Sequence, residues 1–450
     1  MPVLTLRQTL RGLTPSALQP LWDRLQASPM GYRLARGAFW SLMGAVLSRG
    51  LGLVAGIVVA RTLGKEGYGQ LGIIRGTVEM FATFAGFGLG LTATKYVAEL
   101  RQTEPARAGR ILTLSSVVAW TTGVTATLLL ALAAPWLAAH TLSAPALGPE
   151  LRLSSLLVLV GAVNGAQRGA LAGFEAFKRI TWVGLWTGLV NFPALIIGSC
   201  YFGLKGAIGG LITAQALGCL FNRLALVKEA HRTGVPLWTP QWLSELSVLW
   251  KFSLPAVLAS SFVTPVYWFC QTLLVRQPSG YNGMADFAVG AQWRALAQYL
   301  PALLCAAYLP VASSAHARAH PGTRKLMFGG ALLSGLLTGG TSLAVFLVSP
   351  WLLAAYGHGF ASARWVLMWM LLTATFDSIN NILVSTLMAS GRAWLRLLSN
   401  GLWAALVLVC ALVLVPRYLA LGLAMALCLA QGLHLCLQLG LSLYVTRPRP

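Results

Sequence analysis

Stretches of about 20 mainly apolar residues, separated by short polar segments, recur along the chain from residue 38 to residue 445. An α-helix of about 20 residues spans the hydrocarbon of a bilayer. We therefore predict an all-α integral membrane protein with about 12 transmembrane helices. The predicted spans are 38–60, 69–94, 110–134, 151–172, 181–202, 207–227, 248–276, 286–312, 326–350, 363–389, 396–415 and 421–445.

Composition and charge support this prediction. Hydrophobic residues make up 57% of the chain and charged residues 10%, whereas roughly a quarter of an ordinary soluble domain is charged. A net charge of +22 would suggest nucleic acid in a soluble protein, but most of the 33 lysine and arginine residues flank the apolar spans. They concentrate on one side of the predicted membrane, which predicts cytoplasmic N- and C-termini, contact with membrane lipids and no nucleic-acid partner.

Two motifs recur at an offset of roughly half the chain. The motif Glu66–Arg75 resembles Ala285–Arg294, and Leu171–Phe177 resembles Met388–Trp394. Each pair lies at equivalent places in two halves of six spans, so we expect two homologous six-helix lobes around a central cavity, related by an axis along the membrane normal.

The domain organisation follows from this repeat. We predict a cytoplasmic or interfacial N-terminal segment at 1–37, a first lobe at 38–227, a cytoplasmic linker at 228–247 and a second lobe at 248–450.

Three arginines lie inside predicted spans, where a charge costs about 2.5–3.5 kcal/mol at the bilayer centre and usually marks function. Arg75 and Arg294 hold equivalent places in the repeat, so we expect them to face each other across the central cavity, with Arg49 on a neighbouring helix. Guanidinium groups pair well with phosphate. We predict that Arg49, Arg75 and Arg294 contact an anionic substrate.

Two carboxylates, Glu79 and Asp377, also lie inside spans. Both are candidates for coupling transport to a proton or cation. Glu79 follows Arg75 by four residues, one helical turn, so the two could instead form a purely structural ion pair. Both interpretations stay open.

Motifs for catalysis, cofactors and metals are missing from the sequence. There is no phosphate-binding loop, and the seven cysteines include no zinc pattern, so we predict no catalytic residue, no cofactor and no metal. The glycines of Gly86–Gly90, of Gly52 and Gly56, and of Gly72 and Gly76 predict close helix packing or a kink. His316 and His320 fit an interfacial helix end better than a metal site.

Three segments resemble the oligosaccharide flippases of the multidrug/oligosaccharidyl-lipid/polysaccharide exporter superfamily, which include bacterial O-antigen flippases. They are Val58–Gly69 after the first span, Gly88–Ala98 closing the second and Ala172–Phe177 after the fourth. The resemblance implies a flippase of the bacterial inner membrane that moves a polyprenyl-pyrophosphate-linked oligosaccharide to the periplasmic leaflet for surface polysaccharide or O-antigen synthesis. It implies glycosyltransferases and a polymerase of the same pathway as partners.

Two other functions compete with this interpretation. An ion-coupled multidrug antiporter of the same superfamily would need a carboxylate-rich site, and only two acids lie deep in the spans. An envelope polysaccharide polymerase or ligase would be an enzyme with a large external loop. The loops predicted outside the cytoplasm are short, which disfavours an enzyme.

Overall fold

The computed structural model describes residues 29–254, 257, 262–299, 301–302, 305, 323–389 and 393–445. These residues form long helices joined by short connections. The helices are α3 (Pro29–Ala85), α4 (Leu89–Leu100), α5 (Pro105–Trp136), α6 (Gly148–Ser154), α7 (Leu156–Gly173), α8 (Phe177–Thr233), α10 (Val263–Val275), α11 (Gly280–Ala297), α13 (Thr323–Tyr356), α14 (Ala363–Ala389) and α15 (Ala393–Val445).

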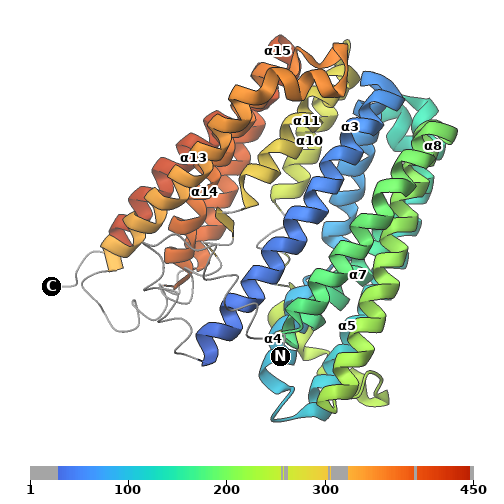
Figure 1. The fold of residues 1–450 in the computed structure, drawn as a ribbon, viewed down its shortest axis with the longest axis vertical. Coiled ribbons are helices and arrows are strands. Elements are labelled where there is room, and N and C mark those ends of the chain that lie inside the picture. Colours follow the sequence, from blue (N-terminus) through green and yellow to red (C-terminus); the bar gives the residue numbers. More distant parts are fainter. Residues whose placement is uncertain are drawn as a thin grey trace, which may run out of the picture.

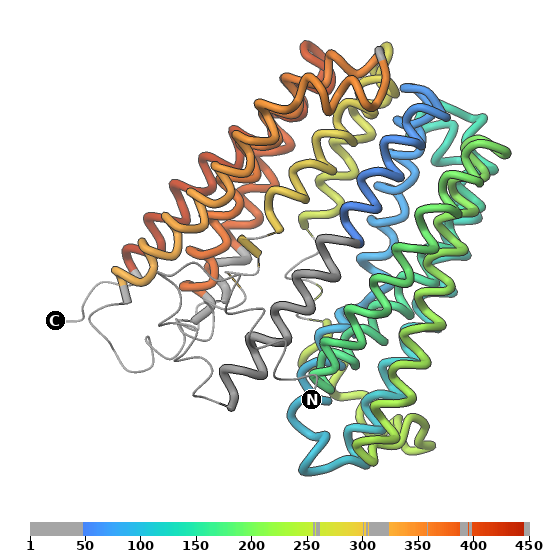
Figure 2. Tube along the Cα trace, viewed as in Figure 1, coloured from blue at the N-terminus to red at the C-terminus, as the bar shows by residue number. Residues whose placement is uncertain are grey.

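Three of these helices are hairpins whose two arms meet at a sharp turn. The turns lie at Gly64 (φ 70°), Gly203 (φ 56°) and Leu419 (φ 52°). Positive φ is accessible to glycine but costs energy at Leu419. In α8 the returning arm packs so closely that a side chain on Gly198 would collide with the backbone of Gly206. Figure 2 shows the two arms of α8 side by side.

Six helical stretches among the described residues are long and apolar enough to cross a membrane. The stretches within α8 and α15 span 57 and 47 residues, and a helix of about 20 residues suffices for one crossing. Their central turns divide each into two crossings. The predicted span 363–389 coincides with α14.

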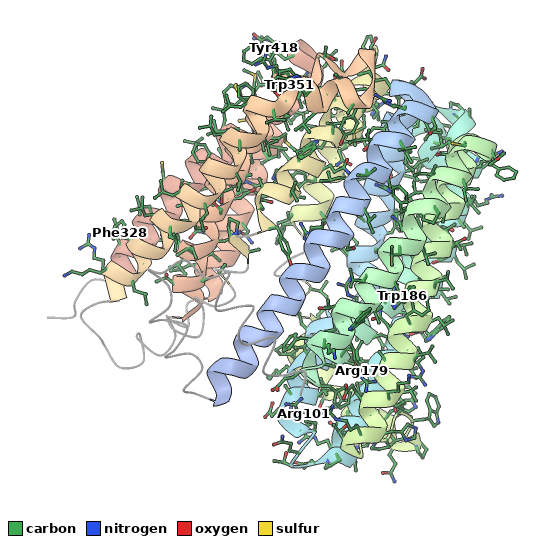
Figure 3. The ribbon with its side chains drawn as sticks, in the orientation of Figure 1. Arg101, Arg179, Trp186, Phe328, Trp351 and Tyr418 are labelled. Atoms are coloured by element: carbon green, nitrogen blue, oxygen red, sulfur yellow. The ribbon has the colours of Figure 1, made fainter. Side chains whose placement is uncertain are left out.

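The helices assemble into two lobes, α3–α8 and α10–α15 (Figure 1). The lobes lie close together at the end where Gly64, Gly203 and Leu419 turn the chain, which we call the turn end. They diverge toward the opposite end, which we call the basic end because Arg101 and Arg179 lie there (Figure 3). Contacts between the lobes join α3 to α10, α11 and α13.

The outer surface is apolar, as the solvent of a bilayer requires. Leu132 is 75% exposed and Leu332 64%. Trp351 and Tyr418 are exposed at the turn end (Figure 3), where aromatic side chains are typical of a membrane–water interface.

The glycine-rich segment Gly86–Gly90 breaks the helix between α3 and α4, as the sequence predicts. Phe87 and Gly88 both adopt positive φ. Beyond the break, Gly90 approaches Gly165 of α7 so closely that a Cβ on Gly90 would lie 3.0 Å from the Gly165 carbonyl oxygen. The prediction of a kink with close packing is therefore confirmed.

Two predicted segments differ in detail or lie outside the described residues. Residues 228–247, predicted as a linker, begin with the last turns of α8 and continue as a 3-10 helix, Pro240–Glu245, that packs on α5. His316 and His320 lie outside the described residues, as does most of the segment 1–37, since α3 begins at Pro29.

Candidate functional site

A cavity of about 500 Å³ lies between the lobes. The first lobe contributes both arms of α3 and the first arm of α8, and the second lobe contributes α10 and α11. Most of the wall is apolar. The polar side chains that line it belong to Ser48, Arg49, Tyr68, Arg75, Glu79, Asn191, Gln271 and Gln292.

Glycines on α3 make room for side chains of the opposite lobe. Gly56 faces Gln292, whose Nε2 would lie 2.8 Å from a Cβ added to the glycine, and Gly76 faces Gln271. Gly52 and Gly72 also line the cavity. The predicted close packing is therefore confirmed at Gly56, Gly72 and Gly76, where it occurs across the lobe interface, but a side chain on Gly52 would meet no atom within 4 Å.

Arg75 and Glu79 both lie on the cavity wall, on the second arm of α3. Although they are one turn apart, no ion pair within 4 Å joins them. Arg75 forms no hydrogen bond or ion pair with any residue that the structure describes. The structural Arg75–Glu79 ion pair, one of the two interpretations that the sequence leaves open, is therefore not formed in this structure.

Arg49 lies on the first arm of α3 and reaches across to the second lobe. Its Nη1 donates a hydrogen bond to the carbonyl oxygen of Ala295 (2.9 Å), and its guanidinium lies 4.4 Å from the ring centre of Tyr299. The residue is exposed and lines the cavity. Arg49 therefore joins the lobes while keeping part of its charge on the cavity wall.

Arg294 is placed differently from the sequence expectation. Its Nη2 donates to Asp377 Oδ2 (2.8 Å) and its Nη1 donates to the hydroxyl of Tyr267 (2.8 Å). Gln298 also donates to Asp377 Oδ2 (2.7 Å). All four residues belong to the second lobe. The expectation that Arg294 faces Arg75 across the cavity is therefore wrong, because Asp377 on α14 holds the guanidinium inside its own lobe.

The turn end of the cavity is closed by polar contacts between the lobes. Lys65 Nζ lies 2.8 Å from Asp286 Oδ1 and also donates to Ser362 Oγ (2.8 Å) and to the Gly359 carbonyl oxygen. Arg61 Nε donates to the Ala355 carbonyl oxygen (2.6 Å). That carbonyl lies in the last turn of α13, where the helix dipole favours a cation. We call Arg61, Lys65, Asp286 and Ser362 the latch.

An aromatic layer lies beneath the latch. The hydroxyls of Tyr68 and Tyr356 donate to Gln292 Oε1 at 3.1 and 3.2 Å, so one amide oxygen binds a tyrosine from each lobe. The Phe360 ring packs against both tyrosines, with ring centres 6.2 and 5.6 Å apart. Latch and aromatic layer together separate the cavity from the turn end.

The ion pairs at the basic end do not cross between the lobes. Among the described residues, Arg101 pairs with Glu175, Arg179 with Glu229, and Arg110 with Glu245, all within the first lobe and the connecting stretch that follows it. Contacts between the lobes thus close the cavity at the turn end, whereas the described residues form no interlobe ion pair at the basic end.

Most of the latch residues lie in segments that stand out in the sequence, but their contact across the lobes was not predicted. Arg61 and Lys65 lie within Val58–Gly69, the segment that carries the family resemblance, and Asp286 lies in the repeat copy Ala285–Arg294. A signal was available: Arg61 and Lys65 are basic residues on the side of the membrane predicted to be poor in them.

Comparison with known proteins identifies the family. The model of the family described as "Polysaccharide biosynthesis protein" matches residues 34–316. The EPS I polysaccharide export inner membrane protein EpsE of Ralstonia solanacearum is 24% identical over 371 residues, covering 78% of this chain and 80% of that protein. The lipid III flippase of Escherichia coli is 25% identical over 249 residues, covering 55% of this chain and 59% of that protein.

A solved structure confirms the fold. A multidrug resistance MATE family transporter of the MOP superfamily, in an inward-facing conformation, superposes with a TM-score of 0.74 at 14% identity, covering 91% of this chain and 98% of that one. The prediction of about twelve transmembrane helices in two lobes is confirmed. The chain therefore belongs to the polysaccharide biosynthesis protein family and is a multi-pass membrane protein with the fold of a MATE family transporter.

Proposed function

We propose that this transporter is a flippase for a lipid-linked oligosaccharide. It carries a polyprenyl-pyrophosphate-anchored saccharide from the cytoplasmic to the periplasmic leaflet of the bacterial inner membrane, for surface polysaccharide or lipopolysaccharide O-antigen synthesis. Glycosyltransferases supply the substrate and a polymerase or ligase consumes it. The transporter itself needs no catalytic residue.

The observation that carries the proposal is the charge on the cavity wall. Arg49 and Arg75 line the cavity together with the single acid Glu79, and Arg75 has no partner among the described residues. A guanidinium offers two parallel donors that match phosphate oxygens. The cavity is therefore suited to an anionic group such as the pyrophosphate.

The latch supplies the other requirement of alternating access, a closed end that can open. The contacts of Arg61 and Lys65 in the latch reach the second lobe, so a rocking motion of one lobe against the other breaks them together. If the basic end faces the cytoplasm, as the basic residues predict, the conformation described here takes up substrate from the cytoplasmic leaflet.

Glu79 is the better candidate for coupling to an ion. Asp377 already accepts hydrogen bonds from Arg294 and Gln298, whereas the side chain of Glu79 lines the cavity. A carboxylate on the substrate route can exchange a proton or cation while the substrate passes.

The test is transport in a defined host. We expect the protein to restore surface polysaccharide in a bacterium that makes a lipid-linked oligosaccharide and lacks its own oligosaccharide flippase. In vesicles, it should move a fluorescent polyprenyl-pyrophosphate oligosaccharide between leaflets. Absence of both activities, with resistance to cationic drugs conferred on a host lacking drug exporters, would contradict the proposal and favour the antiporter.

A further inference from the structure

A second hollow, unrelated to the central cavity, lies at the basic end between the two arms of α8. Its volume is about 970 Å³. We call it the α8 groove. Its lining is Phe174, Glu175, Ala176, Lys178, Arg179, Trp182, Val183, Trp186, Phe221, Leu224, Ala225, Lys228, Glu229 and Arg232.

Polarity changes in one direction along the groove. Lys178 and Arg179 at the start of the first arm lie opposite Lys228 and Arg232 near the end of the second arm, so the charges gather at the mouth. Further along, the first arm presents Trp182 and Trp186, which are 45% and 53% exposed, and the second arm presents Phe221 and Leu224. The distance from Lys178 to Trp186 along the helix is about 12 Å. A charged mouth followed by an apolar channel matches the head and upper acyl chain of a lipid.

The charge of the mouth is positive. Its acid Glu229 is buried and held by Arg179 (2.6 Å) and Arg232 (3.6 Å). The other acid, Glu175, is paired with Arg101 from α4 (2.7 Å), which is not part of the lining. The lining holds four cations, and Glu229 balances one of their charges while Arg101 from outside the lining balances Glu175, so three positive charges remain. Lys228 is exposed and joins none of the ion pairs among the described residues. The groove therefore favours an anionic head.

The groove faces away from the substrate cavity. On the first arm of α8, Asn191 lines the central cavity and Gly188 packs against Ser48 of α3. Asn191 is five residues beyond Trp186, a rotation of about 140° around the helix. Trp182 and Trp186 are thus turned toward the membrane, and Figure 3 shows Trp186 and Arg179 on the outer helices of the first lobe.

We propose that the α8 groove binds one anionic phospholipid of the surrounding leaflet, with its phosphate at Lys178, Lys228 and Arg232 and an acyl chain along Trp182 and Trp186. Basic pockets between transmembrane helices bind such head groups, each basic residue contributing about 1 kcal/mol near the surface. The bound lipid fixes the turn between α7 and α8 and with it the first arm of α8, which lines the central cavity. The proposal does not depend on the identity of the transported molecule.

The test is native mass spectrometry of the full chain released from nanodiscs of phosphatidylglycerol and phosphatidylcholine. We expect wild type to retain phosphatidylglycerol preferentially, and Lys228→Gln/Arg232→Gln to retain it about fivefold less for each charge removed. The matched control, Arg324→Gln/Lys325→Gln, also removes one arginine and one lysine, from the start of α13, and should keep the lipid.

A further variant, Trp182→Leu/Trp186→Leu, keeps every charge but removes the two rings along which the acyl chain is proposed to lie. It should therefore retain less of both lipids. Equal retention by wild type and Lys228→Gln/Arg232→Gln would overturn the proposal. An equal loss of phosphatidylglycerol from the α13 control would also overturn it, because the lipid would then be attracted by the net charge of the protein and not by the groove. If polyprenyl pyrophosphate at less than one molecule per protein displaces phosphatidylglycerol, the groove binds a transported lipid. That result would overturn the proposal that an anionic phospholipid occupies it.

Discussion

Arg75 and Arg294 hold equivalent places in the two halves of the chain, yet their surroundings differ. Arg75 lies on the cavity wall without a partner among the described residues, whereas Arg294 is held by Asp377 and Tyr267 inside the second lobe. The residues one helical turn after the two arginines, Glu79 and Gln298, also differ in their surroundings. Glu79 lines the cavity, and Gln298, its counterpart, donates to Asp377.

The difference teaches that the repeat preserves position but not role. One arginine lies on the cavity wall, while the charge of the other is neutralised by an acid for which the first lobe has no counterpart at the matching position of α7. If the proposed function holds, Arg75 contacts the substrate and Arg294 stabilises its own lobe. Substitutions at the four positions should separate these roles.

The largest expected effect is loss of the folded second lobe when one partner of its ion pair is removed. Arg294→Ala leaves the half-buried Asp377 without its cation and with Gln298 as its remaining donor, and breaking a buried ion pair in this way costs about 3–5 kcal/mol. We expect a large fall in membrane-inserted protein and in thermal stability in detergent, and recovery in Arg294→Met/Asp377→Leu. Normal abundance and stability of Arg294→Ala with lost export would instead give Arg294 the substrate contact predicted from sequence.

The next effect concerns export without a change in stability. Arg75→Ala removes a charge that no described residue pairs with, so abundance should match wild type while surface polysaccharide falls about tenfold or more. Arg75→Lys should retain part of the activity because it keeps the charge but loses the paired donors. Full export by Arg75→Ala at normal abundance would show that Arg75 does not contact the substrate.

A smaller effect is expected at Gln298. Gln298→Leu removes a hydrogen bond to an ionised group and should destabilise the protein by about 1.5–3 kcal/mol. Thermal unfolding in detergent measures it, and Gln298→Glu should be worse because it sets a second acid beside Asp377. A stability equal to wild type for both variants would show that Arg294 alone satisfies Asp377.

The smallest effect on stability is expected at Glu79. Glu79→Gln makes the first lobe resemble the second and should change the unfolding free energy by less than about 0.5 kcal/mol, as is usual for a site without a specific contact. If Glu79 couples transport to an ion, export by this variant should no longer respond to collapse of the proton or sodium gradient. A marked loss of stability would instead support the interpretation that Glu79 and Arg75 form a structural ion pair.

The fold was accessible from the sequence because span length and hydrophobicity are local properties. The span 363–389 matches α14, and the gaps left between neighbouring spans contain the turns at Gly64, Gly203 and Leu419. The position of a charge along a helix was equally accessible, as Arg75 and Glu79 both line the cavity.

Rotation about the helix axis was not accessible. Arg294 turns toward α14 and meets an acid far away in sequence, and hydropathy, which is high on every face of such a helix, does not define that direction. The latch was missed for a related reason. Its residues belong to different halves of the chain, and only their packing brings Lys65 to Asp286.

The latch also bears on how such proteins can diverge. Lys65 directly precedes the first copy of the repeated motif and Asp286 lies in the second copy, so the two halves of the chain bind each other beside their matching segments. Neither can drift independently. Recombination that joins the first half of one transporter to the second half of another would separate matched residues at this point, so exchange between relatives should succeed only where both halves of the latch are inherited together.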